Sequence, residues 1–178
     1  MANNTQKKKP ITTTEPIEKD ISLQEPIIPK DIDPNTIVTV HNGFQGALVY
    51  KSPRTGEKFR WSSFGDEQEM ELRELRNAKS SKKSFFINNW FMFDDDNAWV
   101  IDYLGLKQYY KNAIKLEDFD ELFQKPVGEM KKFISGLSAG QKQSVSYRAR
   151  QLVANEEIDS RKTITALEEA LGVELIER

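Results

Sequence analysis

The sequence lacks cysteine and contains a single histidine, His41, and both features limit its chemistry. Without cysteine the chain forms no disulfide, thiolate zinc site, iron–sulfur cluster or cysteine nucleophile, which fits a reducing compartment. Serine–histidine catalysis has only His41 available. This residue precedes Asn42 and Gly43 at the end of a predicted strand, where a turn is expected. We therefore expect no catalytic role for the histidine.

Long apolar runs and an excess of one charge are also missing. No stretch of about eighteen apolar residues exists, so no transmembrane helix is predicted. Lys7–Lys9 are not followed by the apolar core of a secretory signal. A net charge of −2, from 26 basic and 28 acidic residues, gives no overall attraction to nucleic acid or to an anionic membrane. The scattered glycines form no phosphate-binding loop, and no cofactor is expected.

Proline is concentrated in residues 1–35, which hold five of the seven prolines of the chain. Because proline fixes φ and removes a backbone donor, neither a helix nor a central strand is expected to run through this stretch. Aliphatic side chains recur between the prolines, at Ile11, Ile17, Ile21, Leu23, Ile27, Ile28 and Ile32. We interpret residues 1–35 as an extended arm that lies along the surface of another protein. Its partner contacts are expected from Ile17, Ile21, Ile27 and Ile28.

Residues 36–93 are predicted to form a β-rich domain. β-branched residues and turn residues predict an antiparallel meander of three strands, at residues 36–40, 47–51 and 58–62. The third strand alternates cleanly, with Phe59 and Trp61 on its apolar face. A short helix is expected over residues 69–78. The apolar run at residues 84–93 predicts a central strand that is covered on both faces.

Residues 94–178 are predicted to form a helical subdomain, because apolar side chains recur there at helical spacing. Helix-end signals stand at Ser138 with Gln141, which is the pattern of a capping box, at Asp159 or Ser160, and at Gly172. The expected fold class is therefore α+β. It comprises an extended N-terminal arm, a small and mainly antiparallel sheet with a helix, and a C-terminal helical bundle.

A basic stretch at residues 131–162 leaves a second function open. Residues 165–175 (TALEEALGVEL) resemble the closing helix of repressor-type helix-turn-helix domains. That helix is acidic, whereas a helix that reads the major groove presents a basic face to DNA. Binding of nucleic acid is therefore kept as an alternative, carried by Lys142, Arg148, Arg150, Arg161 and Lys162.

Two further sites are weighed against plainer interpretations. Asp94–Asp96, with Asp102 further on, supply oxygen ligands of the kind that Mg²⁺ or Ca²⁺ prefers, which would suit a metal-dependent enzyme. Acidic residues at a helix N-terminus also complement the helix dipole, and that explanation suffices. Aromatic residues near Lys58 and Arg60 suggest a platform for stacking bases. Aromatics on one face of a strand are more simply a hydrophobic core, and Trp61 is expected to be buried.

The overall pattern resembles that of small accessory or virion proteins of tailed bacteriophages. The resemblance is carried by the leader at residues 15–34, the strand-rich stretch at residues 36–65 and the capped helical tail that ends at residues 171–173. It implies a role in assembly, in a virion or the host cytoplasm, with other structural proteins or copies of this chain as partners. Together with the arm, it favours a non-enzymatic interaction protein.

Overall fold

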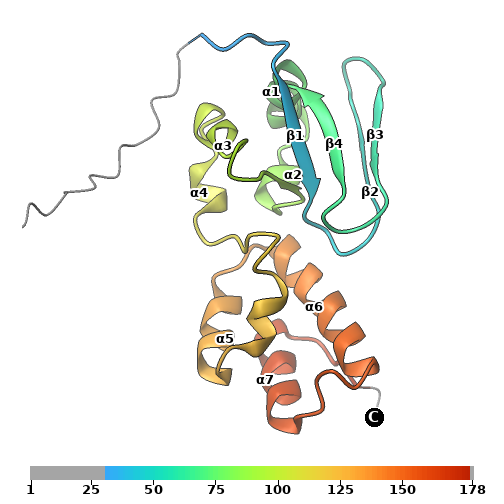
Figure 1. Cartoon of the computed structure of the whole chain (residues 1–178), viewed down its shortest axis with the longest axis vertical. Helices are drawn as coiled ribbons and strands as arrows, with labels where there is room; N and C mark the ends of the chain where they lie inside the picture. The colour runs from blue at the N-terminus through green and yellow to red at the C-terminus, as the bar shows by residue number, and fades with distance from the viewer. Residues whose placement is uncertain (1–30, 177–178) are drawn as a thin grey trace, which may run out of the picture.

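The computed structural model describes residues 31–176 and has an α+β fold, which confirms the predicted class (Figure 1). The strands are β1 (Ile37–Asn42), β2 (Leu48–Lys51), β3 (Lys58–Trp61), β4 (Glu67–Glu71) and β5 (Phe91–Met92). The helices are α1 (Leu72–Ser81), α2 (Ser84–Ile87), α3 (Trp99–Tyr103), α4 (Lys107–Tyr110), the 3-10 helix η1 (Asp120–Gln124), α5 (Val127–Ser135), α6 (Ala139–Ala154) and α7 (Arg161–Leu171).

The three predicted strands form, and β2 pairs with β3 as the meander requires. The predicted pairing of β1 with β2 is wrong, because the strands form two separate antiparallel sheets. One sheet has the order β4-β1-β5, and the other is the β2–β3 hairpin alone. Val38 of β1 stands opposite Met70 of β4. The side-chain amide of Asn42 donates to the backbone oxygens of Gly46 and Ser63, at 2.7 and 2.8 Å. These bonds tie the loop after β1 to the β3–β4 connection, and β2 pairs with β3 instead of β1.

The helix expected over residues 69–78 begins later, at Leu72, because Glu67–Glu71 pair with β1 as a strand. The central strand expected over residues 84–93 is also wrong. Ser84–Ile87 form one helical turn, and only Phe91–Met92 pair with β1. Asn89 separates the two pieces in the left-handed conformation, with φ of 53°, which asparagine adopts more readily than most residues.

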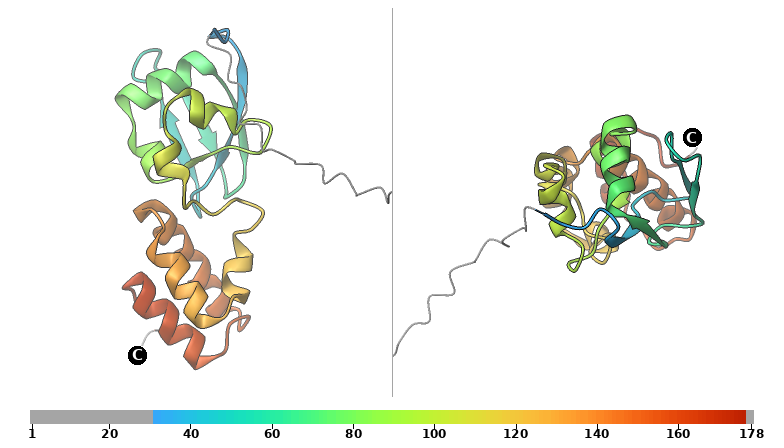
Figure 2. Two further views of the ribbon diagram at one scale, coloured as in Figure 1. Left: turned by 90° about the vertical axis from the view of Figure 1, so that its left-hand side faces the viewer. Right: turned by 90° about the horizontal axis from the view of Figure 1, so that it is seen from above.

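Two hydrophobic clusters lie one above the other, and Figure 2 shows the sheets with α1–α4 above and the later helices below. The first cluster is built around Tyr50, Trp61 and Phe91, all fully or almost fully buried. Burial of Trp61, whose Nε1–H donates to the Val40 carbonyl at 2.9 Å, confirms the core interpretation of the strand aromatics. We call this part the first lobe. The predicted domain boundary falls between residues 93 and 94, but the first cluster continues to Leu106.

The second lobe consists of η1 and α5–α7, whose cluster includes Met130, Ile134 and Leu167. The helix caps follow the sequence signals in part. The hydroxyls of Ser138 and Ser160 accept bonds from the backbone N–H groups at the starts of α6 and α7. Gly172 ends α7 in the left-handed conformation. The reciprocal half of the capping box is missing, because the side chain of Gln141 bonds elsewhere.

Two buried polar side chains of α6 bind backbone groups, Gln141 within the second cluster and Ser144 across to the first lobe. The amide of Gln141 donates to the Ile114 carbonyl and accepts from the Ile114 N–H, each at 3.0 Å. The hydroxyl of Ser144 donates to the Gly43 carbonyl at 3.1 Å and accepts from the Gln45 N–H at 3.2 Å. Since these side chains are almost fully buried, the bonds satisfy backbone groups that water does not reach.

Candidate functional site

The four isoleucines from which partner contacts are expected, Ile17, Ile21, Ile27 and Ile28, lie outside the described residues. The structure does describe the last residues of the arm. Ile32 packs against the first cluster. The carbonyls of Pro34 and Thr36 accept bonds from the N–H groups of Arg73 and Leu72, at 2.8 and 2.9 Å. The arm is therefore attached to the body at a defined place, the start of α1.

These two backbone bonds also complete the N-terminus of α1. The first N–H groups of a helix have no partner within it and need acceptors from elsewhere. Glu71, the residue before α1, supplies no side-chain cap. Carbonyls at the end of the arm take that place, so the first turn of α1 and the root of the arm stabilise each other.

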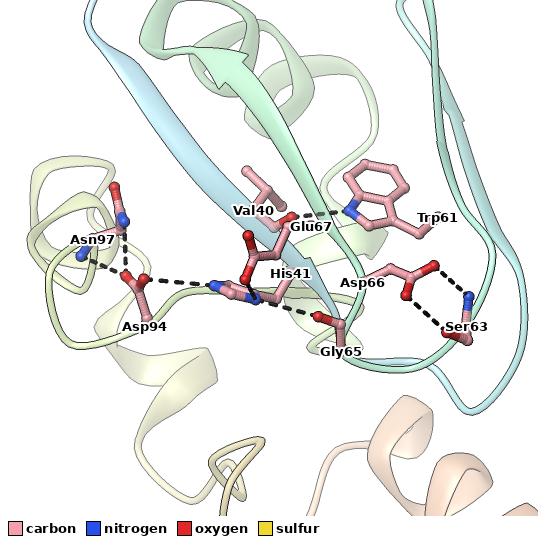
Figure 3. Close-up of polar contacts among 9 residues, drawn as sticks. All are labelled: Val40, His41, Trp61, Ser63, Gly65, Asp66, Glu67, Asp94 and Asn97. Carbon is pink, nitrogen blue, oxygen red and sulfur yellow. Dashed lines mark hydrogen bonds and ion pairs between the residues drawn. The ribbon is translucent and has the colours of Figure 1, made fainter.

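The only histidine lies in a polar cluster at the end of β1 (Figure 3). His41 is 8% exposed, and its Nδ1 lies 3.4 Å from the Gly65 carbonyl and 3.8 Å from a carboxylate oxygen of Glu67. Nε2 faces Asp94 at 3.6 Å. All three neighbours present oxygen atoms to the ring. His41 thus links β1 to the β3–β4 connection and to the segment after β5.

Asp94 is held on its other side by Asn97. The backbone N–H and the side-chain amide of Asn97 donate to Oδ1 of Asp94, at 2.9 and 2.7 Å. Burial raises the pKa of Asp94, but the two bonds from Asn97 and the proximity of His41 lower it by more, so the net pKa lies below its ordinary value. The plainer interpretation, acidic residues at a helix N-terminus, is met only in part. Asp94 closes the turn before α3, whereas α3 begins at Trp99 without a side-chain cap.

Asp66 orders the connection between β3 and β4, which carries Gly65 (Figure 3). Its carboxylate accepts from the N–H groups of Ser62 and Ser63, at 2.8 and 2.9 Å, and from the Ser63 hydroxyl at 2.8 Å. These bonds, with the Ser63 hydroxyl first, lower the pKa of Asp66. The same connection carries Phe64 into the second lobe, where its ring centroid lies 4.7 Å from that of Phe119.

The aspartates of the run Asp94–Asp96 do not share a site. Asp94 turns to His41 and Asn97, whereas Asp95 forms an ion pair with Lys115 at 2.8 Å. The hydrogen bond and charge of Asp95 raise the pKa of Lys115. Within residues 31–176, no group of three or more histidine, aspartate or glutamate side chains is placed to hold a metal ion.

Two cations of the basic stretch have partners inside the second lobe. Arg148 of α6 donates to both carboxylate oxygens of Asp120, from Nε at 2.9 Å and from Nη2 at 2.6 Å. This paired bond raises the pKa of Arg148. Arg150 donates to the Glu174 carbonyl at 3.3 Å. Both side chains thereby hold η1 and the C-terminal residues against α6.

The other three cations of that alternative are more open. Lys142 is half-buried on α6, and Arg161 and Lys162 are exposed in the first turn of α7. Cations in the first turn oppose the positive end of the helix dipole, which makes this turn an attractive place for an anion to approach. The structure therefore separates the five predicted residues into two with structural bonds and three that are available to a partner.

The structure also forms a charged surface around Lys58 and Arg60, which the sequence indicated only as the surroundings of a base-stacking platform. Val49, Lys51, Lys58 and Arg60 form the solvent-facing side of the β2–β3 hairpin, and we call this set the hairpin face. The register places Lys51 directly opposite Lys58. Like charges opposite each other destabilise a strand pair. The alternation of Lys58–Trp61 in the sequence indicates this face as well as the buried one.

No family model, curated protein or solved structure matches this chain in the comparisons made. Among the helices of residues 31–176, none is long and apolar enough to cross a membrane.

Proposed function

We propose that this protein is a non-enzymatic interaction protein of a multi-subunit assembly and that it joins the assembly through its arm, residues 1–35. The repeated isoleucines of the arm support the proposal, because each aliphatic side chain buried on a partner contributes about 1.5–3 kcal/mol. The prolines support it as well. They restrict the conformations of the unbound chain, so less entropy is lost when the arm docks.

The observation that carries the proposal is the attachment of the arm at the start of α1. Pro34 and Thr36 bond to the first N–H groups of α1, and Ile32 packs on the first cluster. A binding segment that leaves a rigid body from a defined point presents its side chains in a limited region of space. Docking of the arm would then also fix the position of the body within the assembly.

The resemblance to accessory and virion proteins of tailed bacteriophages indicates which kind of assembly the protein would join. On this proposal the protein is a particle component, and its partners are other structural proteins or further copies of itself. It is then expected in the virion or in the cytoplasm of the host. A fixed body with a docking arm suits a protein that decorates or closes a junction between larger subunits.

Deletion of Met1–Lys30 tests the proposal. The shortened chain keeps Ile32 and every residue of both clusters, so its thermal unfolding midpoint is expected to stay within a few degrees of the full chain. Its incorporation into the assembly is expected to be lost. The measurement is sedimentation of an extract in which the assembly forms, with the protein located by antibody in the large or the small fractions.

Two full-length variants sharpen this test. In the first, serine replaces Ile17, Ile21, Ile27 and Ile28, and incorporation is expected to be lost. In the matched control, serine replaces Lys7, Lys8 and Lys9, and incorporation is expected to persist. Undiminished incorporation of the deletion variant or of the isoleucine variant would show that the arm does not dock the protein.

A further inference from the structure

The outer edge of β2 is open in the described residues. Within the described chain β2 pairs only with β3, while β3 also lies near β4. The Ser52 N–H donates to the Glu57 carbonyl at 2.8 Å, which continues the β2–β3 register by one pair. Because bonded pairs alternate along an antiparallel ladder, Val49 and Lys51 direct their backbone N–H and C=O groups away from β3. These groups form an open edge of the kind to which another strand adds.

The surroundings of this edge suit an added strand. A groove of about 560 Å³ runs beside β2, and Val49, Tyr50, Pro53 and Phe85 contribute its apolar lining. The side chain of Val49 is 47% exposed. Tyr50 and Phe85 contact each other edge to face at 5.3 Å, so this side of the groove is a continuation of the first cluster. A strand with one apolar face can bury that face here.

The charge around the edge selects the kind of strand. Lys51, Lys58 and Arg60 belong to the hairpin face, and Lys82 lines the groove. Lysines on an edge strand deter pairing with neutral strands. An acidic strand would instead relieve the repulsion between Lys51 and Lys58, which stand opposite each other. The expected occupant therefore alternates apolar residues with acidic ones.

One segment of this chain has that pattern. Residues 17–25 (IEKDISLQE) are the nine residues between Pro16 and Pro26, which is longer than the usual strand of five or six residues. Ile17, Ile21 and Leu23 fall on one side of an extended chain, with Lys19 and Glu25 as the exceptions on that side. The acidic Glu18 and Asp20 fall on the other side. The segment matches both the apolar groove and the basic hairpin face.

The start of the described chain indicates which copy receives the segment. The described residues begin on the opposite side of β1 from the β2–β3 hairpin, as the first and second figures both show (Figure 1, Figure 2). Its own β2 edge therefore lies across the first lobe from the root of the arm. The edge of a neighbouring molecule has no such obstacle.

We propose that residues 17–23 of one copy add as a strand to the free edge of β2 in a second copy. This inference rests on the proposed function, in which the arm docks, and names the receiving surface and the partner. The backbone groups of Val49 and Lys51 bind the main chain of the segment, and the groove takes its isoleucines. Because the segment and the edge are different surfaces, the contact either closes into a reciprocal pair or ring or continues as a chain of copies.

The test measures self-association of full-length chains by sedimentation velocity. Val49→Pro removes the outward N–H from the edge, a place where proline is tolerated in a sheet, and is expected to weaken association about tenfold or more. Its control, Val49→Thr, keeps the N–H and should associate as the unmodified chain does. Ile21→Pro makes the matching change in the arm, with Ile21→Val as its control. Because this variant changes the arm and not the β2 strand, it still tests the contact if Val49→Pro fails to fold.

A mixing experiment separates the two partners of the contact. The Ile21→Pro chain has an intact edge and the Val49→Pro chain has an intact arm, so each alone is expected to be monomeric while the two together form a one-to-one complex. The inference is overturned if the unmodified chain is monomeric or if neither proline variant reduces association. If the chain is monomeric and the deletion of Met1–Lys30 still abolishes incorporation, the arm binds a different protein. The proposed function then stands without this inference.

Discussion

At the scale of single residues, a buried carboxylate depends on one hydroxyl. Tyr50 donates to Oε1 of Glu74 at 2.6 Å, and Glu74 is only 8% exposed. Burial, followed by the hydrogen bond to Glu74 and its charge, raises the pKa of Tyr50 well above its usual range. A carboxylate in such a place is costly unless a donor satisfies it. The second donor, the Asn77 amide, lies at 3.4 Å.

Tyr50→Phe is therefore expected to lower the free energy of unfolding by about 1–3 kcal/mol, because it removes the donor and leaves the buried carboxylate of Glu74 with only the long bond from Asn77. Chemical denaturation at neutral pH measures the loss. The control is Tyr147→Phe, which removes a hydroxyl from a ring that is 40% exposed. Equal stability of the two variants would show that the Tyr50 hydroxyl contributes nothing of its own.

At the scale of elements, α6 approaches the α2–β5 connection closely through a glycine. A Cβ atom on Gly140 would lie 2.3 Å from the Asn88 carbonyl oxygen and 2.8 Å from Nε1 of Trp90. Both distances are shorter than any ordinary contact, and the carbonyl belongs to the backbone, which does not move aside easily. The absence of a side chain at this position is what lets the first turn of α6 pack on the first lobe.

Gly140→Ala is expected to destabilise the protein by about 1–3 kcal/mol through overpacking, although alanine favours a helix over glycine by about 1 kcal/mol. Gly128→Ala in α5 is the matched control, since a Cβ there meets nothing within 4 Å. That control is expected to be neutral or slightly stabilising. Thermal unfolding of both variants checks the pair, and a shift in the same direction for both would contradict the close approach.

At the scale of the whole molecule, the lobes are joined by buried polar bonds and by aromatic contacts that include Phe64. Ser144 in the second lobe bonds to the Gly43 carbonyl and to the Gln45 N–H. Phe64, from the connection between β3 and β4, packs on the second cluster. Because each lobe completes contacts of the other, we expect the two clusters to unfold in one cooperative transition.

Ser144→Ala is expected to lower stability by about 1–2 kcal/mol and to broaden or divide that transition, because two backbone groups at the junction lose their partner. Differential scanning calorimetry measures both effects. Ser146→Ala is the control on the same helix, since the Ser146 hydroxyl donates only within α6, to the Lys142 carbonyl at 2.8 Å. A single sharp transition in both variants would mean that the lobes are coupled by other contacts.

The sequence by itself determined the features that depend on near neighbours along the chain. Ser138 and Ser160 cap their helices, and Gly172 ends α7, because these functions are satisfied within one helical turn. The alternation around Phe59 and Trp61 identified the buried side of β3, since a period of two defines a face whatever covers it. The α+β class followed from the same local patterns.

Only the tertiary structure decided which elements meet. A strand pattern defines a face but names no partner, so the pairing of β1 with β4 could not be predicted from the sequence. Residues 84–93 are mostly apolar, and such a run does not distinguish a covered strand from a helical turn. The same holds for the neighbours of His41 and for Gln141, whose partner Ile114 is 27 residues away. Long-range packing selects these contacts, and no local preference encodes it.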